Sequence, residues 1–261
     1  MEVIYVNEVN LRDLQVEARD VSMALGYFDG VHLGHQKVVE TAKRKAMKYQ
    51  LSLAVLSFFP HPKSVLNPGF EVNYLEPIEQ KIEKLEQLGV DVFYVVEFTM
   101  KLAKVEAAAF MQKYVIGLGA KEIICGFDYT YGAKASGNAE TIKDHVPPHI
   151  GVTIVDELKW HGQKISSTLI RKYLSECRLQ EIPSLLGDYY KTKYCCKNGI
   201  LPNYSLPNIG EYKILIEKDD TISEAIAKVK SKKKILLQYE PPSFNSVLTI
   251  KWLEKIESKP Y

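Results

Sequence analysis

The chain has 261 residues, of which 46% are apolar and 25% are charged. This length allows one large domain, or a medium domain with a smaller one, and the composition is typical of a globular protein rather than a disordered or membrane chain. The formal net charge is only +2, so bulk electrostatics give no attraction to nucleic acid, and we expect no nucleic-acid partner.

The sequence shows no targeting or membrane signal. The first residues mix charged with apolar side chains, and no apolar run approaches the roughly 20 residues that span a bilayer. We therefore expect a cytoplasmic protein with no membrane contact. The cysteines have neither paired metal-ligand spacing nor the density of a disulfide scaffold, and we interpret all four as reduced, structural thiols: Cys125, Cys177, Cys195 and Cys196.

Residues 21–155 alternate between short apolar, β-prone runs and amphipathic helical patterns, which predicts an α/β domain with a parallel sheet. The predicted strands are Ser22–Phe28, Leu53–Phe59, Val92–Glu97, Glu122–Gly126 and Val152–Val155. The predicted helices are His35–Tyr49, Pro77–Leu88 and Val105–Leu118, the last two followed by Gly89 and Gly119. In such sheets ligands bind beyond the carboxyl ends of the strands, so the residues that directly follow each predicted strand are the candidates for binding and catalysis.

The alternation stops near residue 187, where we place a domain boundary. We predict a domain over residues 1–186 and a small β-rich domain over residues 187–261. The second domain is expected to contain one helix near Ile222–Val229, a solvated lysine-rich turn at Lys230–Lys234, and strands at Tyr212–Ile216, Ile235–Tyr239 and Val247–Trp252.

A glycine-flanked turn, Gly26–His35, follows the first predicted strand and leads directly into a helix. Gly34 leaves room for a ligand beside the backbone, and the helix start offers unpaired N–H groups and a positive dipole end to anions. His32 and His35 are three residues apart, so on a helix both project to one face and can donate to the same phosphate chain. We therefore predict a phosphate site.

Two alternatives stay open for this histidine pair. One is a capping histidine beside a core histidine, and the other is a metal pair, although no third ligand of suitable spacing is present. Asp29 is a further candidate from the same turn, where an aspartate can also simply bond its own backbone.

A second constellation, Ile165–Arg171, places hydroxyl groups before an apolar helical stretch. The simple interpretation of Ser166, Ser167 and Thr168 is a helix N-cap. We expect Arg171 in the first helical turn, where a cation opposes the helix dipole unless an anion offsets it, and a guanidinium fork suits pyrophosphate.

Two further strand exits carry aromatic side chains. The segment Cys125–Gly137 combines glycines and aromatics with Asp128, which suits a nucleotide or a flat ring, although aromatic clusters are more often plain core. The segment Ser57–Pro62 is stiffened by two prolines, and its aromatics could cover a ring or belong to a surface turn.

Together these motifs resemble those of the prokaryotic FAD synthetase family, whose members usually join an FMN adenylyltransferase module to a riboflavin kinase module. The resemblance covers roughly residues 15–187 and rests on four motifs in the family's order: Gly26–His35 with its His-x-Gly-His core, Ser57–Pro62, Gly126–Gly137 and Ile165–Arg171. It implies a Rossmann-like nucleotidyltransferase domain that uses ATP with Mg²⁺, takes FMN as substrate and yields FAD.

The resemblance also implies roles for individual residues. The catalytic set is His32, His35 and Arg171. The ATP-binding set is Gly26, Phe28, Asp29, Gly34, Gly126, Asp128, Ser167 and Thr168. The FMN-binding set is Phe58, Pro60, His61, Tyr129 and Tyr131. Tyrosines stand at 129 and 131 where the family commonly has phenylalanine, and Ala135 stands where many members have arginine. No metal ligand and no oligomeric state are assigned.

The C-terminal third departs from the family pattern. A riboflavin kinase module normally carries a Gly-Phe-Pro-Thr-Ala-Asn motif, which this sequence lacks. Only a faint similarity to that module remains, in Leu201-Pro202 and in the run from Pro207 to Tyr212. We predict a truncated, kinase-inactive β domain.

The predicted reaction is direct, in-line attack of the FMN phosphate on the α-phosphorus of ATP, with pyrophosphate leaving. The acceptor phosphate is already ionised at neutral pH, so His32 and His35 serve as electrostatic donors rather than as a strong base. Two alternatives are the same chemistry on another phosphate acceptor, and a non-catalytic flavin-binding regulatory protein.

Overall fold

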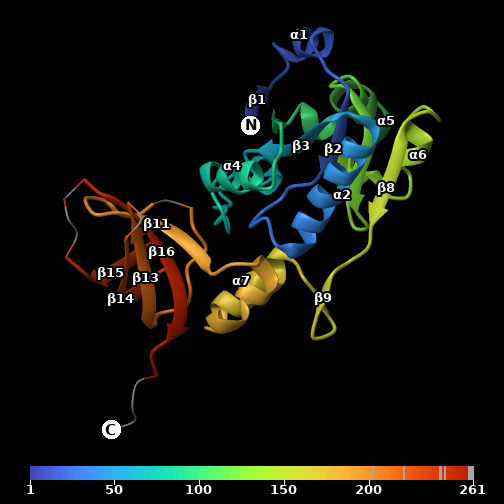
Figure 1. Ribbon diagram of the computed structural model, residues 1–261. Coiled ribbons are helices and arrows are strands. Elements are labelled where there is room, and N and C mark those ends of the chain that lie inside the picture. Colours follow the sequence, from blue (N-terminus) through green and yellow to red (C-terminus); the bar gives the residue numbers. More distant parts are fainter. Residues whose placement is uncertain (202, 220, 241–242, 244, 258–261) are drawn as a thin grey trace. The chain divides into compact units, whose positions relative to one another are not determined.

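The computed structural model describes residues 1–201, 203–219, 221–240, 243 and 245–257. Contacts within the chain divide it into two compact units, shown in Figure 1. The N-terminal unit comprises Met1–Val72 and Ile78–Leu158, and the C-terminal unit comprises Asn73–Pro77 and Lys159–Tyr261. Residues 159–186, which the sequence assigned to the first domain, therefore group with the C-terminal sheet. We call Asn73–Pro77 the strap.

A fully parallel six-stranded sheet forms the N-terminal unit, in the order β1-β4-β3-β2-β5-β8. Its strands are β1 (Glu2–Val6), β2 (Val21–Leu25), β3 (Ser52–Phe59), β4 (Val92–Glu97), β5 (Ala120–Gly126) and β8 (Gly151–Val155). All five predicted strands are present. The sequence analysis missed β1, a short edge strand of sequence EVIYV in which only Val6 is buried.

Helices cover both faces of this sheet. They are α1 (Leu11–Val16), α2 (Leu33–Tyr49), α3 (Pro62–Leu66), α4 (Ile78–Gln87), α5 (Ala107–Phe110) and α6 (Ile142–His145), with 3₁₀ turns η1 (Leu102–Lys104) and η3 (Ala133–Ala135). The predicted helix over residues 105–118 is split into α5 and the π-helical segment η2 (Met111–Ile116). Gly89 and Gly119 follow their helices with φ of 81° and 91°, as helix-ending glycines do.

The core lies on both sides of the sheet because successive strand side chains point to opposite faces. Met23 of β2 packs in the cluster that contains Phe110 and Met111. Its neighbour Ala24 packs in the other cluster, with Val39 of α2. A hairpin of β6 (Thr130–Tyr131) and β7 (Gly137–Asn138) follows β5.

The C-terminal unit is built on an antiparallel sheet in the order β12-β11-β16-β13-β14-β15. Its strands are β11 (Tyr190–Cys195), β12 (Gly199–Ile200), β13 (Gly210–Lys218), β14 (Thr221–Ser231), β15 (Lys234–Gln238) and β16 (Val247–Lys255). The edge strands β12 and β15 contact each other, so the sheet curls toward a barrel. Buried Trp252 donates from Nε1 to Thr192 Oγ1 at 3.0 Å inside it.

The helix predicted near Ile222–Val229 is wrong, because these residues lie in β14. This strand pairs with β13 on one side and with β15 on the other. Ala227 and Val229 are buried, whereas Lys228 between them is half-buried and Lys230 is exposed. Non-local pairing and burial of one face thus override the local helical pattern. The Lys230–Lys234 turn is exposed, as predicted.

The remaining elements of the C-terminal unit precede the sheet. They are β9 (Lys159–Trp160), β10 (Gln163–Lys164), α7 (Ser167–Ser175), η4 (Leu179–Glu181) and α8 (Pro183–Leu186). The strap joins this unit through a parallel bridge between Tyr74 and Tyr204. Two segments were noted above for their faint similarity to the riboflavin kinase module. In the run from Pro207 to Tyr212, strand β13 begins at Gly210. In Leu201-Pro202, Pro202 lies outside the described residues. None of the helices described is long and apolar enough to cross a membrane.

Candidate active site

The two predicted phosphate-binding histidines stand together at the start of α2. His32 is the N-cap of the helix, and its Nδ1 accepts the backbone N–H of His35 at 3.2 Å. The two rings stack, with 3.6 Å between their centroids and 16° between their planes. Because Nδ1 of His32 accepts a hydrogen bond, the ring proton lies on Nε2. The capping alternative is therefore correct for His32, and it fixes the tautomer that presents an N–H donor.

The turn before α2 has an uncommon backbone. Phe28 and Val31 have positive φ values of 54° and 36°, and Gly30 has 83°. A β-branched residue such as valine rarely adopts this region, and such outliers gather where the surrounding structure imposes them. Phe28 and Asp29 are buried, at 1% and 4% exposure, so the turn is packed rather than loose.

Helix α4 and strand β3 hold the carbonyl groups of this turn. Lys81 is only 3% exposed and donates to the Tyr27 carbonyl at 2.8 Å, while its Nζ lies 4.6 Å from the centre of the Tyr27 ring. Ser57 donates from Oγ to the same carbonyl at 2.8 Å. Lys84 donates to the Gly30 carbonyl at 3.3 Å. The sequence analysis missed both lysines, whose only signal is their spacing of three on one helix.

The strand exit after β3 places His61 against this turn. The His61 ring lies edge-on to the Tyr27 ring, with centroids 4.4 Å apart. His61 caps α3, and its Nδ1 accepts the Lys63 N–H at 3.0 Å. Pro60, in the same exit, is half-buried. The predicted segment thus provides a cap for α3 and an aromatic neighbour for the turn before α2.

The other predicted flavin contacts lie largely within the core. Phe58 packs on Phe98 and Phe110, with centroids 5.8 and 5.9 Å away. Tyr131 is buried and shares a hydrogen bond of 2.7 Å with His145 Nδ1. Its position matches the plain-core interpretation that the sequence left open.

Tyr129 differs from Tyr131 although their rings stack at 5.7 Å. The Tyr129 hydroxyl oxygen is buried and has no hydrogen-bond partner among the described residues. Burial raises the pKa of this phenol well above its ordinary value, so it is a neutral donor. Gly126 and Asp128, at the same strand exit, are half-buried and exposed, respectively.

The second constellation lies in the C-terminal unit, at the start of α7. Ser166 is the N-cap and accepts the Leu169 N–H at 3.2 Å. Ser167 and Thr168 are the first two helical residues, half-buried and exposed. Arg171 is the fifth residue of α7, just beyond the first turn in which the sequence analysis expected it. At this position the helix dipole opposes the Arg171 charge less than expected, because the dipole acts mainly within the first turn.

Arg171 is nevertheless held by the backbone. Its Nη2 donates to the Asn73 carbonyl at 3.0 Å and its Nη1 donates to the Ser167 carbonyl at 3.4 Å. The first bond joins α7 to the strap. The guanidinium is thus held between the strap and the Ser167 carbonyl in the first turn of α7.

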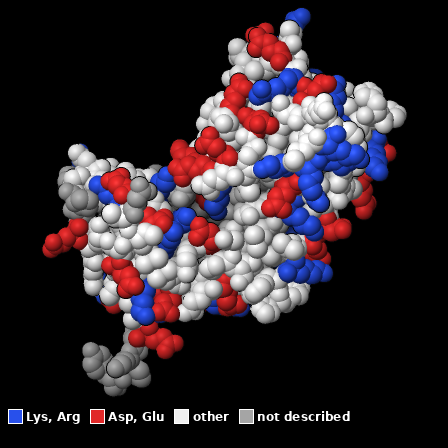
Figure 2. All heavy atoms as spheres, viewed as in Figure 1, with Lys and Arg blue, Asp and Glu red and all other residues white. Residues whose placement is uncertain are grey.

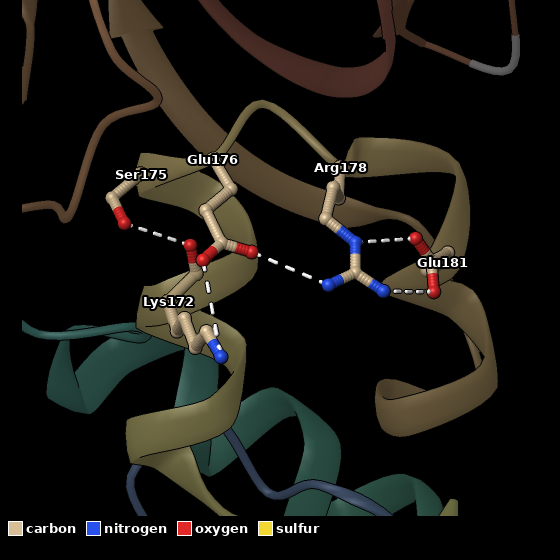
Figure 3. Close-up of polar contacts among 5 residues, drawn as sticks. All are labelled: Lys172, Ser175, Glu176, Arg178 and Glu181. Carbon is tan, nitrogen blue, oxygen red and sulfur yellow. Dashed lines mark hydrogen bonds and ion pairs between the residues drawn. The ribbon is translucent and has the colours of Figure 1, made fainter. Parts of the chain in front are cut away.

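The far end of α7 is fixed by the side chains drawn in Figure 3. Arg178 donates in a fork to both carboxylate oxygens of Glu181, at 2.6 and 2.7 Å, and also pairs with Glu176 at 3.3 Å. Its guanidinium lies 4.0 Å from the centre of the Tyr173 ring. A forked, stacked arginine sets geometry more firmly than a single ion pair, so it ties η4 to α7.

Charge is mixed over the face of the molecule that Figure 2 draws. Figure 2 shows acidic and basic side chains interspersed over the visible face, in keeping with a net charge of +2. Among the described residues there is no group of three or more His, Cys, Asp or Glu side chains that could hold a metal ion.

Comparison with known proteins identifies relatives along nearly the whole chain. A family profile described as FAD synthetase matches residues 14–169. A bifunctional riboflavin kinase/FMN adenylyltransferase of Listeria monocytogenes is 38% identical over 230 residues, covering 82% of this chain and 73% of the relative. The protein of the same description from Bacillus subtilis is 32% identical over 288 residues, covering 99% of this chain and 91% of the relative.

Two further relatives differ in description. A Listeria monocytogenes protein described as FAD synthetase is 31% identical over 219 residues, covering 81% of this chain and 86% of its own. A crystal structure of a Streptococcus pneumoniae protein, described as a macrolide-efflux protein, superposes with a TM-score of 0.87 at 26% identity, over 100% of this chain and 93% of that one.

Proposed function

Because the chain belongs to the FAD synthetase family, we propose that it is an FMN adenylyltransferase, which transfers AMP from ATP to FMN and releases FAD and pyrophosphate. The observation that carries this assignment is the stacked pair of His32 and His35 at the start of α2. It presents imidazole donors and a helix N-terminus at the carboxyl end of β2, where parallel α/β sheets bind ligands.

The chemistry needs positioning more than it needs proton transfer. The FMN phosphate is ionised at neutral pH and attacks the α-phosphorus of ATP in line, while pyrophosphate departs. His32 and His35 stabilise the charge that builds on the phosphate oxygens, and Gly34 allows close approach. Gly26, Phe28 and Asp29 shape the turn, whose carbonyls Lys81 and Lys84 hold in place.

Further residues are assigned to the nucleotide and the flavin. Ser167, Thr168 and Arg171 hold the triphosphate and then the pyrophosphate, and Gly126 and Asp128 contact the ATP. The Tyr129 hydroxyl supports a flavin contact, since a buried donor with no described partner gains a hydrogen bond from a ligand. The remaining proposed FMN contacts are Phe58, Pro60, His61 and Tyr131.

Magnesium is assigned as part of the substrate. Mg²⁺ keeps several waters and binds mainly to nucleotide phosphates, needing at most one or two carboxylates. This agrees with the lack of a cluster of metal ligands among the described residues. We therefore propose MgATP as the nucleotide substrate, in a cytoplasmic enzyme.

We also propose that residues 1–186 carry this activity and that residues 187–261 form a truncated, kinase-inactive riboflavin-kinase-like domain. The sequence lacks the family's kinase motif. The match to the Bacillus subtilis relative extends over 288 residues, more than the 261 of this chain, so this chain lacks segments that the relative has.

The test is chromatography of products after incubation with MgATP and either FMN or riboflavin. We expect FAD from FMN and no product from riboflavin. FMN or FAD formed from riboflavin would show a retained kinase. No product from either substrate would contradict the proposed activity.

A further inference from the structure

The backbone carbonyl of Asn73, in the strap, accepts hydrogen bonds from two side chains of the C-terminal unit. Arg171 donates from Nη2 at 3.0 Å and Ser205 donates from Oγ at 2.9 Å. A carbonyl oxygen has two lone pairs, so both bonds form together. One carbonyl therefore connects the guanidinium proposed to hold pyrophosphate with a hydroxyl group of the β domain.

The backbone around this carbonyl is fixed by the β domain as well. The Tyr74 N–H donates to the Asn203 carbonyl at 2.6 Å, and the Ser205 N–H donates to the Tyr74 carbonyl at 2.8 Å. The Tyr190 hydroxyl, from β11, donates to the Ser205 carbonyl at 2.7 Å. Ser205 is thus anchored to the sheet, and the strap is anchored to Ser205.

The β domain also holds the other end of the helix that carries Arg171. Asn208 donates from its side chain to the Ser175 carbonyl at the end of α7. The Tyr212 hydroxyl donates to the Asn208 carbonyl and lies 3.2 Å from Cys177 Sγ. Both ends of α7 are therefore bonded to elements of the β domain or to the strap that this domain holds.

We propose that Ser205 is a positioning residue for adenylyl transfer: its hydroxyl orients the Asn73 carbonyl, which in turn aims the Arg171 guanidinium at the pyrophosphate group. The inference rests on the proposed function, in which Arg171 binds that group. It gives the β domain a part in the transferase reaction that requires no kinase chemistry.

The test compares Ser205→Ala with Ser205→Thr, which keeps the hydroxyl. Thr221→Ala is the matched control, because it removes a hydroxyl-to-carbonyl bond, to Lys218, elsewhere in the same sheet. One neutral hydrogen bond corresponds to a change of about two- to tenfold. We expect Ser205→Ala to lower kcat and to weaken pyrophosphate binding, measured by calorimetry, by about that factor, with the KM for FMN unchanged. Ser205→Thr and Thr221→Ala should match the wild type.

A double-variant cycle decides whether Ser205 acts through Arg171. In the Arg171→Ala background, Ser205→Ala should cause no further loss of pyrophosphate affinity. Three outcomes would each overturn the inference. The losses of pyrophosphate affinity in the two single variants could multiply in the double variant, or Ser205→Ala could bind pyrophosphate as tightly as the wild type. The third outcome is a loss of affinity that a lower folded fraction, measured by circular dichroism, fully explains. If the wild type makes no FAD, the proposed function fails, and the pyrophosphate titrations still decide the positioning role.

Discussion

Nδ1 of His32 accepts the backbone N–H of His35 at 3.2 Å, and the two imidazole rings stack directly on each other. One side chain thus caps α2 and at the same time supports its proposed catalytic partner. One tautomer serves both the cap and the proposed phosphate contact, because the cap uses Nδ1 and leaves the proton on Nε2. The two roles can be separated by substitution.

His32→Ala removes both the cap and the donor, whereas His32→Asn keeps a good N-cap residue and removes only the imidazole. We expect FAD formation to fall about 100-fold in both variants, as for loss of one oxyanion donor. The alanine variant should also lose about 1 kcal/mol of unfolding free energy, which asparagine retains. Steady-state turnover and thermal unfolding measure the two effects. Wild-type turnover in His32→Asn would show that His32 is only a cap.

Lys81 should stabilise the turn that precedes α2, where phosphate binding is proposed. It is buried and donates to the Tyr27 carbonyl, so Lys81→Met removes this hydrogen bond while the bond from Ser57 to the same carbonyl remains. We expect kcat/KM for ATP to fall about tenfold, since hydrogen bonds to charged groups contribute about 1.5–3 kcal/mol and part of this sets the turn geometry. Initial-rate kinetics at varied ATP measure the effect.

Lys43→Met is the matched control for Lys81→Met. Lys43 also donates to a backbone carbonyl, that of Leu88 at 3.0 Å, but this bond lies away from the turn. Its kcat/KM should equal that of the wild type. An equal loss of kcat/KM for ATP in the two variants would mean that Lys81 supports the fold in general and not the turn before α2.

Much of the N-terminal unit follows from the sequence, because strands buried on both faces read as unbroken apolar runs such as the one in β3. The position of the histidine pair also follows, because it comes directly after β2. The edge strand β1 was missed although its residues are apolar apart from Glu2. The strand β14 was misread as a helix, because its partners β13 and β15 are non-local.

The support of the candidate site could not be predicted in the same way. Lys81 and Lys84 act on carbonyls more than 50 positions away in the chain, and no local pattern encodes such a pairing. The strap is a similar case, because Asn73 offers only its backbone carbonyl to Arg171 and Ser205. Every residue type has a backbone carbonyl, so the presence of asparagine at position 73 does not indicate this contact.

Gly132 should tolerate no side chain. Its φ is 74°, and a Cβ built there would lie 2.6 Å from the Cα of Ala107. Gly69→Ala is the control within the same unit, since Gly69 has a φ of 93° with nothing within 4 Å. Backbone strain should cost each variant about 1–2 kcal/mol, and the overlap should cost Gly132→Ala about 1–3 kcal/mol more. Denaturant unfolding measures the free energy of unfolding of both variants. An equal loss of this free energy in Gly132→Ala and Gly69→Ala would contradict the predicted overlap with Ala107.

Cys125 should make the folded state sensitive to alkali. Burial, with a smaller contribution from the Asp128 charge, raises the pKa of its thiol from 9.0 to about 12. The folded protein therefore keeps this proton at a pH where the unfolded chain has lost it. Stability is unaffected below about pH 9 and declines between about pH 9 and 12, because there the unfolded state binds fewer protons.

The decline should be less steep in Cys125→Ala than in the wild type, because this variant lacks the thiol whose pKa burial raises. Thermal unfolding across pH 7 to 11, with reductant present, measures the slopes. In the folded wild type, iodoacetamide should leave Cys125 unmodified, because the thiolate is the reactive form and burial both suppresses and shields it. Rapid labelling of Cys125 at pH 8.5 without unfolding would mean that this thiol is neither shielded nor held protonated at the end of β5.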